Sequence, residues 1–280
     1  MEPGRPSGTA LSAAHARAVH QVADTPCVFP DPLALRVIGA DPADPPRSRM
    51  PAPVRLFMAL RHRLAEEALA TAVADGTRQL VVLGAGLDTF AYRNPHPGLR
   101  VFEVDHPDTQ AWKRKRLADA GIPVPGTVTY CPVDFGEQDL DAGLAGTGFD
   151  QEAPSFFAWL GVVPYLTADT VRATLRFAAG QSAPSEIVFD YNQPPSELPA
   201  ERRAALTAQA EAMAERGEPW RSSFTPGDIA RELAGSGFDT VEDFGWRQCL
   251  ERYALDRSTP DLFGGRIVHA ASGRTGIRAA

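Results

Sequence analysis

Two glycines and a carboxylate at a fixed spacing are the residues best suited to chemistry in this chain. Gly84 and Gly86 follow an apolar run at 79–83, and Asp105 stands nineteen residues after Gly86, at the end of a second strand-like run. Glycines after a buried strand let the main chain turn tightly against a ligand, and an acid after the next strand can accept hydrogen bonds from a ribose diol. The spacing therefore predicts a nucleoside-binding βαβ unit.

The turn itself distinguishes between two nucleoside ligands. A dinucleotide loop favours a third glycine where this chain has Thr89, and Asp88 would place negative charge beside the pyrophosphate. S-adenosyl-L-methionine carries no phosphate, and its sulfonium and ammonium groups are compatible with nearby acids. The residues favour S-adenosyl-L-methionine, while a plain tight turn and an NAD-dependent oxidoreductase remain as alternatives.

Composition restricts the classes of protein. With 280 residues and 44% hydrophobic content, the chain can form one α/β domain with additions. The net charge of −7 argues against a nucleic-acid or anionic-membrane binder. Cys27, Cys131 and Cys249 have neither disulfide-framework nor metal-site spacing, which fits a reducing cytoplasm. No apolar run approaches the roughly 20 residues of a membrane span, so we expect a cytoplasmic protein with no metal, membrane or nucleic-acid partner.

Seven segments have the apolar character of strands, and helical or loop segments separate most of them. They are residues 79–83, 100–104, 127–133, 155–160, 186–191, 239–244 and 266–270. This alternation predicts an α/β fold with a doubly wound, mainly parallel seven-stranded Rossmann-like sheet, whose last two strands form an antiparallel edge. Ligands bind beyond the carboxyl ends of such strands, where Gly84, Asp105 and Asp134 all lie.

Helices are expected before this core and within it. Residues 10–22 and 54–74 are predicted helices, with a proline-rich segment at 41–53 between them. We expect residues 1–75 to form a helical lid, 76–273 the core and 274–280 a flexible tail. An alanine-rich helix within 196–220, part of an insertion at 192–224, would also cover the site. Thr225 and Pro226 then supply the N-cap and first turn of the next core helix.

Four motifs, in this order, resemble the leucine carboxyl methyltransferase family. They are the sequences at 83–93, 102–107, 133–135 and 159–166. The segments 16–18, 31–34 and 61–63 further resemble its bacterial branch of S-adenosylmethionine-dependent O-methyltransferases. The resemblance runs from about residue 10 to residue 273, and it implies a methyltransferase sheet that binds S-adenosyl-L-methionine.

The resemblance also implies roles for residues at the strand ends. Gly84 and Gly86 would let the main chain approach the methionyl part of the cofactor, so that a side chain at Gly86 would crowd it. Asp105 would accept both ribose hydroxyls. Asp134 would accept from the adenine amino group, and the backbone of Phe135 would meet the ring nitrogen. Each acid keeps a structural alternative, a helix cap for Asp105 and a strand-end turn for Asp134.

Basic residues near the site differ in how they can be interpreted. Arg61 resembles the residue that pairs with the cofactor carboxylate, a role that suits the planar fork of a guanidinium. Arg63 competes for this role, and both could instead be solvated charges on an amphipathic helix. The basic cluster at 113–116 is interpreted as a solvated helix face.

The chain departs from the family pattern at Leu160, where many relatives carry glutamate before Gly161. Leucine cannot accept a hydrogen bond, so cofactor binding would rely more on the remaining contacts, or water or a neighbouring acid such as Asp88 would replace the glutamate. We expect glutamate at position 160 to tighten cofactor binding if the pocket is otherwise unchanged. The same departure leaves open a cofactor-binding protein that has no transfer activity.

The sequence thus predicts in-line methyl transfer to the carboxylate or hydroxyl of a small molecule, with secondary metabolism as the expected setting. A carboxylate acceptor needs no base, because alignment and desolvation supply most of the acceleration. Substrate-site candidates are His106, Tyr165, Tyr191 and Trp220, and for the first three a hydrogen-bonding or packing role is equally open. No catalytic residue is assigned, and methylation of a protein C-terminus is not carried over from the family name. Neither the acceptor nor the oligomeric state can be inferred from the sequence.

Overall fold

The computed structural model describes residues 7–41, 44, 47, 50–135, 138–215, 217–262 and 264–273. In these ranges seven strands form one sheet with the order β3-β2-β1-β4-β5-β7-β6. The strands are β1 (Gln79–Leu83), β2 (Arg100–Asp105), β3 (Val128–Pro132), β4 (Ser155–Trp159), β5 (Ser185–Asn192), β6 (Thr240–Phe244) and β7 (Gly265–Ser272). The first five strands pair in parallel, and β7 pairs antiparallel with both β5 and β6. The predicted fold class, including the antiparallel edge, is confirmed.

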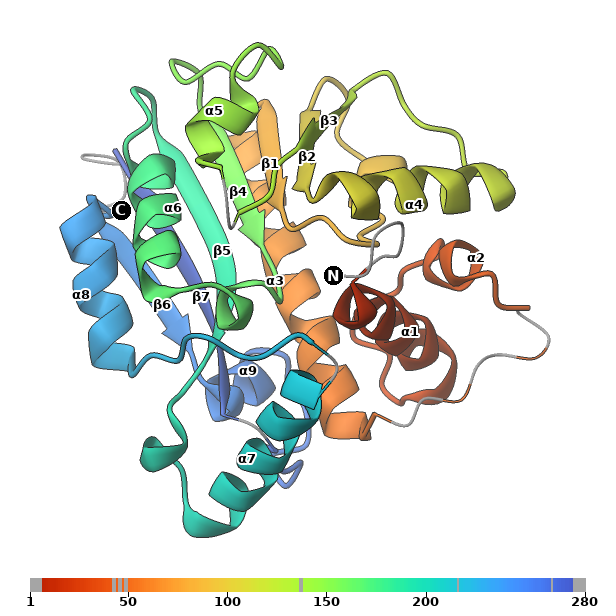
Figure 1. The fold of residues 1–280 in the computed structure, drawn as a ribbon, viewed down its shortest axis with the longest axis vertical. Helices are drawn as coiled ribbons and strands as arrows, with labels where there is room; N and C mark the ends of the chain where they lie inside the picture. The colour runs from red at the N-terminus through yellow and green to blue at the C-terminus, as the bar shows by residue number, and fades with distance from the viewer. Residues whose placement is uncertain are drawn as a thin grey trace.

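Helices cover both faces of the sheet (Figure 1). They are α1 (Gly8–Ala23), α2 (Ala34–Ile38), α3 (Ala52–Ala74), α4 (Pro107–Asp119), α5 (Leu140–Leu144), α6 (Ala168–Ala179), α7 (Ala200–Glu215), α8 (Pro226–Ser236) and α9 (Trp246–Arg252). Short 3₁₀ turns are η1 (Phe90–Tyr92), η2 (Val163–Tyr165) and η3 (Pro195–Glu197). The expected tail at 274–280, and six residues of the proline-rich segment 41–53, lie outside the described residues.

Alternation along the buried strands builds two hydrophobic cores, one on each face. Val81 and Leu83 of β1 pack with side chains of α5, α6 and α8. Leu80 and Val82 of the same strand point the other way and pack with α3 and α9. Because successive side chains of a strand point to opposite faces, an apolar run at β1 holds both helix layers at once. The carboxyl ends of the central strands are thereby fixed relative to one another.

One residue of the basic cluster at 113–116 is buried, so the prediction of a fully solvated helix face is wrong. Arg114 and Lys115 are exposed, as a solvated helix face requires, but only 1% of the Lys113 side chain is exposed. The Lys113 ammonium donates to Glu103 Oε1 at 2.8 Å, inside the structure. The periodicity of a basic run could not show that one of its members turns inward to a carboxylate on β2.

Within the described part of the chain, no helix combines the length and apolarity needed to cross a bilayer.

The N-cap predicted at Thr225 is present and forms a capping box. The main-chain N–H of Asp228 donates to Thr225 Oγ1 at 3.1 Å, and the N–H of Thr225 donates to Asp228 Oδ2 at 3.0 Å. Thr225→Ala is expected to lower the free energy of unfolding by about 1 kcal/mol, because the N–H of Asp228 loses its side-chain acceptor and the hydroxyl no longer donates to Asp228 Oδ2. Urea unfolding checks this value. The control Thr71→Ala replaces an exposed threonine near the end of α3, and no loss of stability is expected from it.

Candidate functional site

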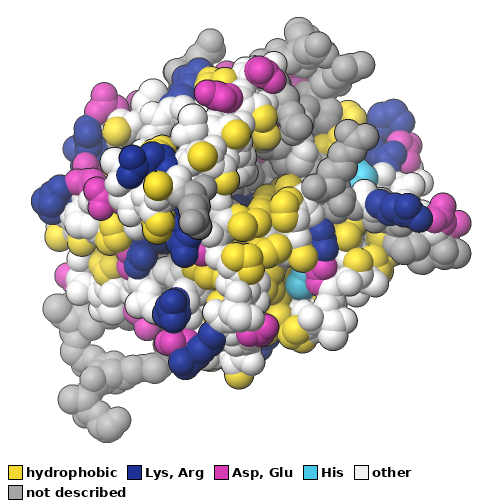
Figure 2. Space-filling view, turned by 90° about the horizontal axis from the view of Figure 1, so that it is seen from below, with side chains coloured by type: hydrophobic (Ala, Val, Ile, Leu, Met, Phe, Trp, Pro, Cys, Tyr) yellow, Lys and Arg dark blue, Asp and Glu magenta, His cyan; other side chains and the backbone are white. Residues whose placement is uncertain are grey.

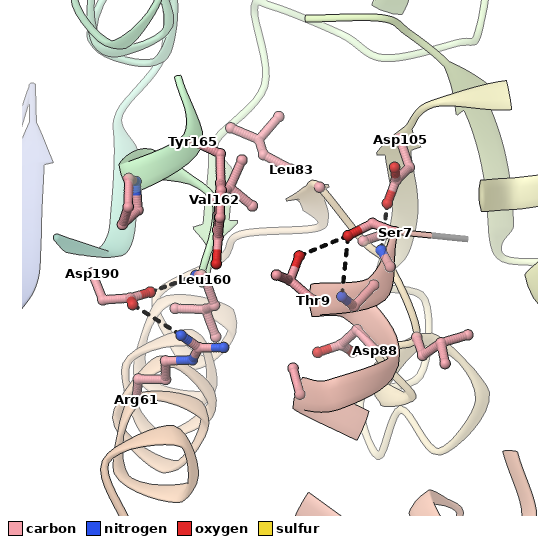
Figure 3. A pocket seen from close by; sticks show the side chains of 18 of the residues that line it. Ser7, Thr9, Arg61, Leu83, Asp88, Asp105, Leu160, Val162, Tyr165 and Asp190 are labelled. Atoms are coloured by element: carbon pink, nitrogen blue, oxygen red, sulfur yellow. Dashed lines mark hydrogen bonds and ion pairs between the residues drawn. The ribbon is translucent and has the colours of Figure 1, made fainter. Parts of the chain in front are cut away.

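A cavity of about 1100 Å³ opens beyond the carboxyl ends of the central strands. Its floor includes Gly84 after β1, Asp105 at the end of β2, Gly161 after β4 and Asp190 near the end of β5. Residues of α1 and α3 and the segment 217–221 line the other walls. Figure 3 shows Asp105 on one side of the cavity and Arg61 with Asp190 on the other. This is the place that the topology of an open α/β sheet assigns to a ligand.

The glycine turn has the geometry that its sequence indicates, with one amendment. Gly84 and Gly86 adopt left-handed φ angles of +64° and +44°, which side chains disfavour. A Cβ at Gly84 would lie 2.4 Å from Val162 Cγ2, and one at Gly86 would lie 3.2 Å from Ala10 Cβ. The space that a side chain would take is therefore already filled by protein. A side chain at Gly86 would first crowd α1, and not the ligand as the sequence predicted.

Asp105 joins the end of β2 to the glycine turn. Its Oδ2 accepts from the main-chain N–H of Gly86 at 2.5 Å, and its Oδ1 accepts from the N–H of His106 at 2.7 Å. Burial raises the pKa of the Asp105 carboxyl, and the two main-chain donors oppose this rise. Each carboxylate oxygen can accept more than one hydrogen bond, so the group retains capacity for a ligand hydroxyl. The helix-cap alternative does not describe it, because the cap of α4 is His106.

His106, Asp134 and Phe135 surround the β2 and β3 side of the cavity. The Nδ1 atom of His106 accepts from the N–H of Asp108 at 3.2 Å, and its Nε2 lies 3.7 Å from Asp134 Oδ2. The side chain of Asp134 is 41% exposed, so this acid is at the rim of the cavity. Phe135 packs against the core beneath. The three residues lie near Asp105 and form one end of the site.

Arg61 occupies the opposite end, in contact with an acid that sequence reasoning missed. Its Nη1 donates to Asp190 Oδ2 at 2.9 Å, while Asp190 Oδ1 accepts from the N–H of Gly161 at 2.6 Å (Figure 3). Arg61 Nε is buried, and none of the residues that the structure describes is its hydrogen-bond partner. A Cβ at Gly161 would approach Arg61 Nη2 to 2.6 Å, so the guanidinium requires glycine there. Asp190 could have been noticed as an acid near the carboxyl end of a buried strand.

Arg63, the competitor of Arg61, points away from this site. Its side chain is 38% exposed, and its Nε donates to Glu67 Oε1 at 2.8 Å. The guanidinium carbon stacks 4.3 Å above the centre of the Tyr253 ring. Arg63 is not part of the cavity wall. Of the two arginines, only Arg61 is therefore placed to meet a ligand.

Asp88 lies on the cavity wall, but its carboxylate is engaged within the protein. Oδ1 accepts from the N–H of Phe90 at 2.7 Å, and Oδ2 lies 3.5 Å from His62 Nε2. Burial raises the pKa of Asp88, but the neighbouring His62 and Arg17 outweigh this effect and hold the pKa far below its usual range. Burial lowers the pKa of His62. Asp88 thus stabilises the turn that follows Gly86.

Arg17 and Asp31 fasten the same turn to the N-terminal helices. The Nη2 atom of Arg17 donates to the carbonyl of Leu87 at 2.6 Å, and its Nε donates to Asp31 Oδ2 at 3.2 Å. The fully buried Asp31 also accepts from the hydroxyl of Thr89 at 2.7 Å. Both residues belong to the segments that resemble the bacterial branch, but their spacing alone indicated no chemistry. Their role here is to position the turn.

The substrate-site candidates separate into two groups. Tyr165 and Trp220 line the cavity, and burial raises the pKa of the Tyr165 hydroxyl. Leu160 also lines it. The structure does not bring Tyr191 to the cavity, since its side chain is 1% exposed and its hydroxyl donates to Asp243 Oδ2 at 2.8 Å. Strand alternation explains the difference, because Tyr191 and its neighbour Asp190 point to opposite faces of the sheet.

Comparison with known proteins identifies the family of this chain. The family model described as leucine carboxyl methyltransferase matches residues 10–179. YktD of Bacillus subtilis (strain 168), assigned as an S-adenosyl-L-methionine-dependent methyltransferase, is 31% identical over 267 residues, which cover 85% of this chain and 88% of YktD. The residues that the family model matches include helices α2 and α3, most of α1, and strands β1 to β4.

Two solved structures share the fold. A Thermobifida fusca protein assigned as a methyltransferase aligns with a TM-score of 0.59 and 18% identity, over 97% of this chain and 96% of that one. Magnesium protoporphyrin IX methyltransferase from Synechocystis PCC 6803, with bound SAH, aligns with a TM-score of 0.51 and 13% identity, over 85% and 92% of the two chains. From the family match and the extent of similarity to YktD, the chain belongs to the leucine carboxyl methyltransferase family.

Proposed function

We propose that this protein is an S-adenosyl-L-methionine-dependent methyltransferase that transfers a methyl group to a carboxylate or hydroxyl oxygen of a small molecule. The observation that carries the proposal is a single cavity with Asp105 at one end and Arg61 at the other. Membership of the leucine carboxyl methyltransferase family supports the cofactor and the reaction class. The choice of a small acceptor rests on the cavity, and the choice of oxygen rests on the resemblance to the bacterial branch of O-methyltransferases.

The residues present fit S-adenosyl-L-methionine. Asp105 would accept from the ribose hydroxyls, while Asp134 and the main chain of Phe135 would meet the adenine. Arg61 would pair with the carboxylate of the amino-acid part. Its buried Nε, which has no partner among the described residues, supports this assignment because a buried donor is normally paired. A ligand carboxylate would satisfy it.

Apolar side chains from separate segments form the remaining walls. Val54 and Met58 come from α3, Met213 from α7, and Tyr165 and Trp220 from the connections that cover the site. Seen from below, the molecule is hollowed at the centre of one face, where hydrophobic side chains gather (Figure 2). Apolar pockets with few polar groups are typical of small-molecule sites. This lining supports an acceptor with an apolar body.

Two covering segments are tied together over the cavity. The N–H of Thr9, in the first turn of α1, donates to Glu218 Oε2 at 3.0 Å. Thr9 and Glu218 both line the cavity. A carboxylate at a helix N-terminus is stabilised by the partial positive charge there. The closure of α1 against the segment after α7 would exclude water from the acceptor.

Within this site, alignment would supply most of the rate enhancement. When bound, the cofactor supplies a methyl group that its sulfonium already activates. Arg61 and Asp105 would fix the two ends of the cofactor, and the apolar walls would orient the acceptor oxygen and exclude water. Because burial raises its pKa, Tyr165 stays protonated near neutral pH and can donate but not abstract a proton. His106 already accepts from the main chain through Nδ1, so we assign no base.

The test is incubation with methyl-labelled S-adenosylmethionine and a panel of apolar carboxylic acids and phenols. A product that loses its label on mild alkaline hydrolysis is a methyl ester, whereas a phenol ether keeps the label. Binding of the cofactor without transfer to any acceptor would favour the second candidate function, a cofactor-binding protein, for which Leu160 is the motivating observation. A parallel titration with NADH fluorescence tests the oxidoreductase alternative, and no binding is expected.

With a carboxylic acid as acceptor, the rate of transfer is expected to be independent of pH between about 6 and 9, because a carboxylate is already ionised and needs no base. Single-turnover kinetics on a saturated complex provide the measurement. A titration near the ordinary histidine pKa would contradict this prediction. His106→Asn would then show whether the His106 imidazole is the group responsible.

A further inference from the structure

We propose that Asp190 binds the α-ammonium group of the cofactor and so supplies the acid that Leu160 cannot provide. This inference rests on the proposed function, because it assumes that S-adenosylmethionine occupies the cavity. Asp190 lies on the wall of the cavity, with only 6% of its side chain exposed. A carboxylate so strongly buried requires compensating partners, and its position beside Arg61 suggests a shared ligand.

The chemistry of the ligand requires the two residues to be neighbours. In an amino acid the carboxylate and the ammonium are attached to one carbon, so their receptors must lie side by side and carry opposite charge. Arg61 Nη1 and Asp190 Oδ2 are 2.9 Å apart, which meets this condition. Arg61 retains its unpaired Nε for the carboxylate. Asp190 Oδ1 and Oδ2 each accept one protein hydrogen bond and can accept another.

Other acids on the cavity wall are engaged elsewhere. Asp88, the acid suggested by the sequence, accepts from Phe90 and faces His62. Glu66 pairs with the guanidinium of Arg93, and Glu218 accepts from the N–H of Thr9. Asp105 and Asp134 lie at the end assigned to the nucleoside. Of the acids on the wall, Asp190 is the one in contact with Arg61.

A purely structural role for Asp190 makes a different prediction. If the carboxylate only positioned Arg61 and the Gly161 turn, its loss would weaken every ligand that carries the amino-acid carboxylate to the same extent. If it binds the ammonium, only ligands with that group would be weakened. The two roles are separated by a pair of ligands that differ in the ammonium alone.

The experiment measures calorimetric affinities of three probes: S-adenosylhomocysteine, its analogue with hydrogen in place of the ammonium, and methylthioadenosine. The unaltered protein is expected to bind S-adenosylhomocysteine between about 10-fold and 100-fold more tightly than the deaminated analogue. In Asp190→Asn this ratio is expected to fall below about 3-fold. In the matched control Asp88→Asn the ratio is expected to persist. An unchanged ratio in Asp190→Asn, or its loss in Asp88→Asn, overturns the proposal.

The probes also separate this inference from the function on which it rests. If neither S-adenosylhomocysteine nor methylthioadenosine binds the unaltered protein, the proposed function fails. If both bind but the ammonium makes no difference, only the role of Asp190 fails. If Asp190→Asn does not fold, the test uses the unaltered protein and Asp88→Asn. Equal affinities for S-adenosylhomocysteine and its deaminated analogue overturn the inference. A ratio of these affinities of about 10-fold or more in both proteins supports it.

A second substitution, Leu160→Glu, tests the role of Asp190 independently. Because Leu160 lies on the wall immediately before Gly161, a glutamate there could reach the same ammonium. The substitution is expected to restore discrimination in the Asp190→Asn protein and to add less than about 3-fold to the affinity of the unaltered protein, whose ammonium site is already filled. An equal gain in both backgrounds would mean that Asp190 leaves the ammonium unbound.

Discussion

Asp105→Ala is expected to reduce the affinity for S-adenosylhomocysteine by at least about 100-fold. Two charge-assisted hydrogen bonds to the ribose, each worth about 1.5–3 kcal/mol, correspond to a loss of two to four orders of magnitude. The main-chain donors of Gly86 and His106 would also lose their acceptor, and the glycine turn would no longer be fastened to β2. Isothermal titration calorimetry measures the affinity directly.

Two comparisons show whether the ribose is the cause. A 2′-deoxy form of the ligand should bind the unaltered protein more weakly, but Asp105→Ala should not distinguish it from the parent ligand. Asp134→Ala is the matched control at the same end of the cavity, and its loss should be smaller, about 10-fold, because a 41% exposed carboxylate is already solvated. Unaltered affinity in Asp105→Ala would contradict the ribose role. A loss of thermal stability without loss of discrimination would assign Asp105 to the turn alone.

The strands could be predicted almost residue by residue because of their burial. A parallel strand covered on both faces contains a nearly continuous apolar run, and β1 at Gln79–Leu83 has the predicted bounds. The other predicted strands agree to within two residues at either end. The order of the strands depends on contacts between distant segments, so the position of β7 between β5 and β6 could not be derived from local pattern.

The candidate site could likewise be predicted where its residues belong to one local unit, and not where tertiary packing brings them together. The glycine turn and Asp105 lie within one βαβ unit, so their spacing indicates their proximity. Arg61 and Asp190 are 129 residues apart and meet only because α3 packs across β5. Tyr191 was selected as an aromatic residue near a strand end, but alternation turns it away and presents Asp190. Side-chain direction at a strand end depends on the register, which the residue type does not reveal.

Lys113→Met is expected to lower the free energy of unfolding by about 3–5 kcal/mol, because it leaves the charge of Glu103 buried without its counter-ion. The two side chains are each 1% exposed, with 2.8 Å between Nζ and Oε1. The hydroxyl of Tyr92 also donates to Glu103, at 2.9 Å. Urea unfolding measures the loss. The control Lys115→Met breaks an ion pair whose lysine is 71% exposed, and it should cost less than about 1 kcal/mol.

Two measurements show whether the unpaired charge of Glu103 causes the loss of stability in Lys113→Met: the dependence of the loss on pH, and the effect of also replacing Glu103. Burial raises the pKa of Glu103, and Lys113 and the Tyr92 hydroxyl oppose this rise, so without Lys113 the opposition is weaker. A carboxyl whose pKa is higher in the folded than in the unfolded state takes up a proton on folding, so the deficit of Lys113→Met should shrink as the pH falls through that pKa. Glu103→Leu combined with Lys113→Met removes both charges and should recover most of the stability. Equal losses in the single and double variants would indicate lost packing instead. Neither Lys113 nor Glu103 lines the cavity, so the folded fraction of Lys113→Met should still bind S-adenosylhomocysteine, and the main loss should be in the number of binding-competent molecules.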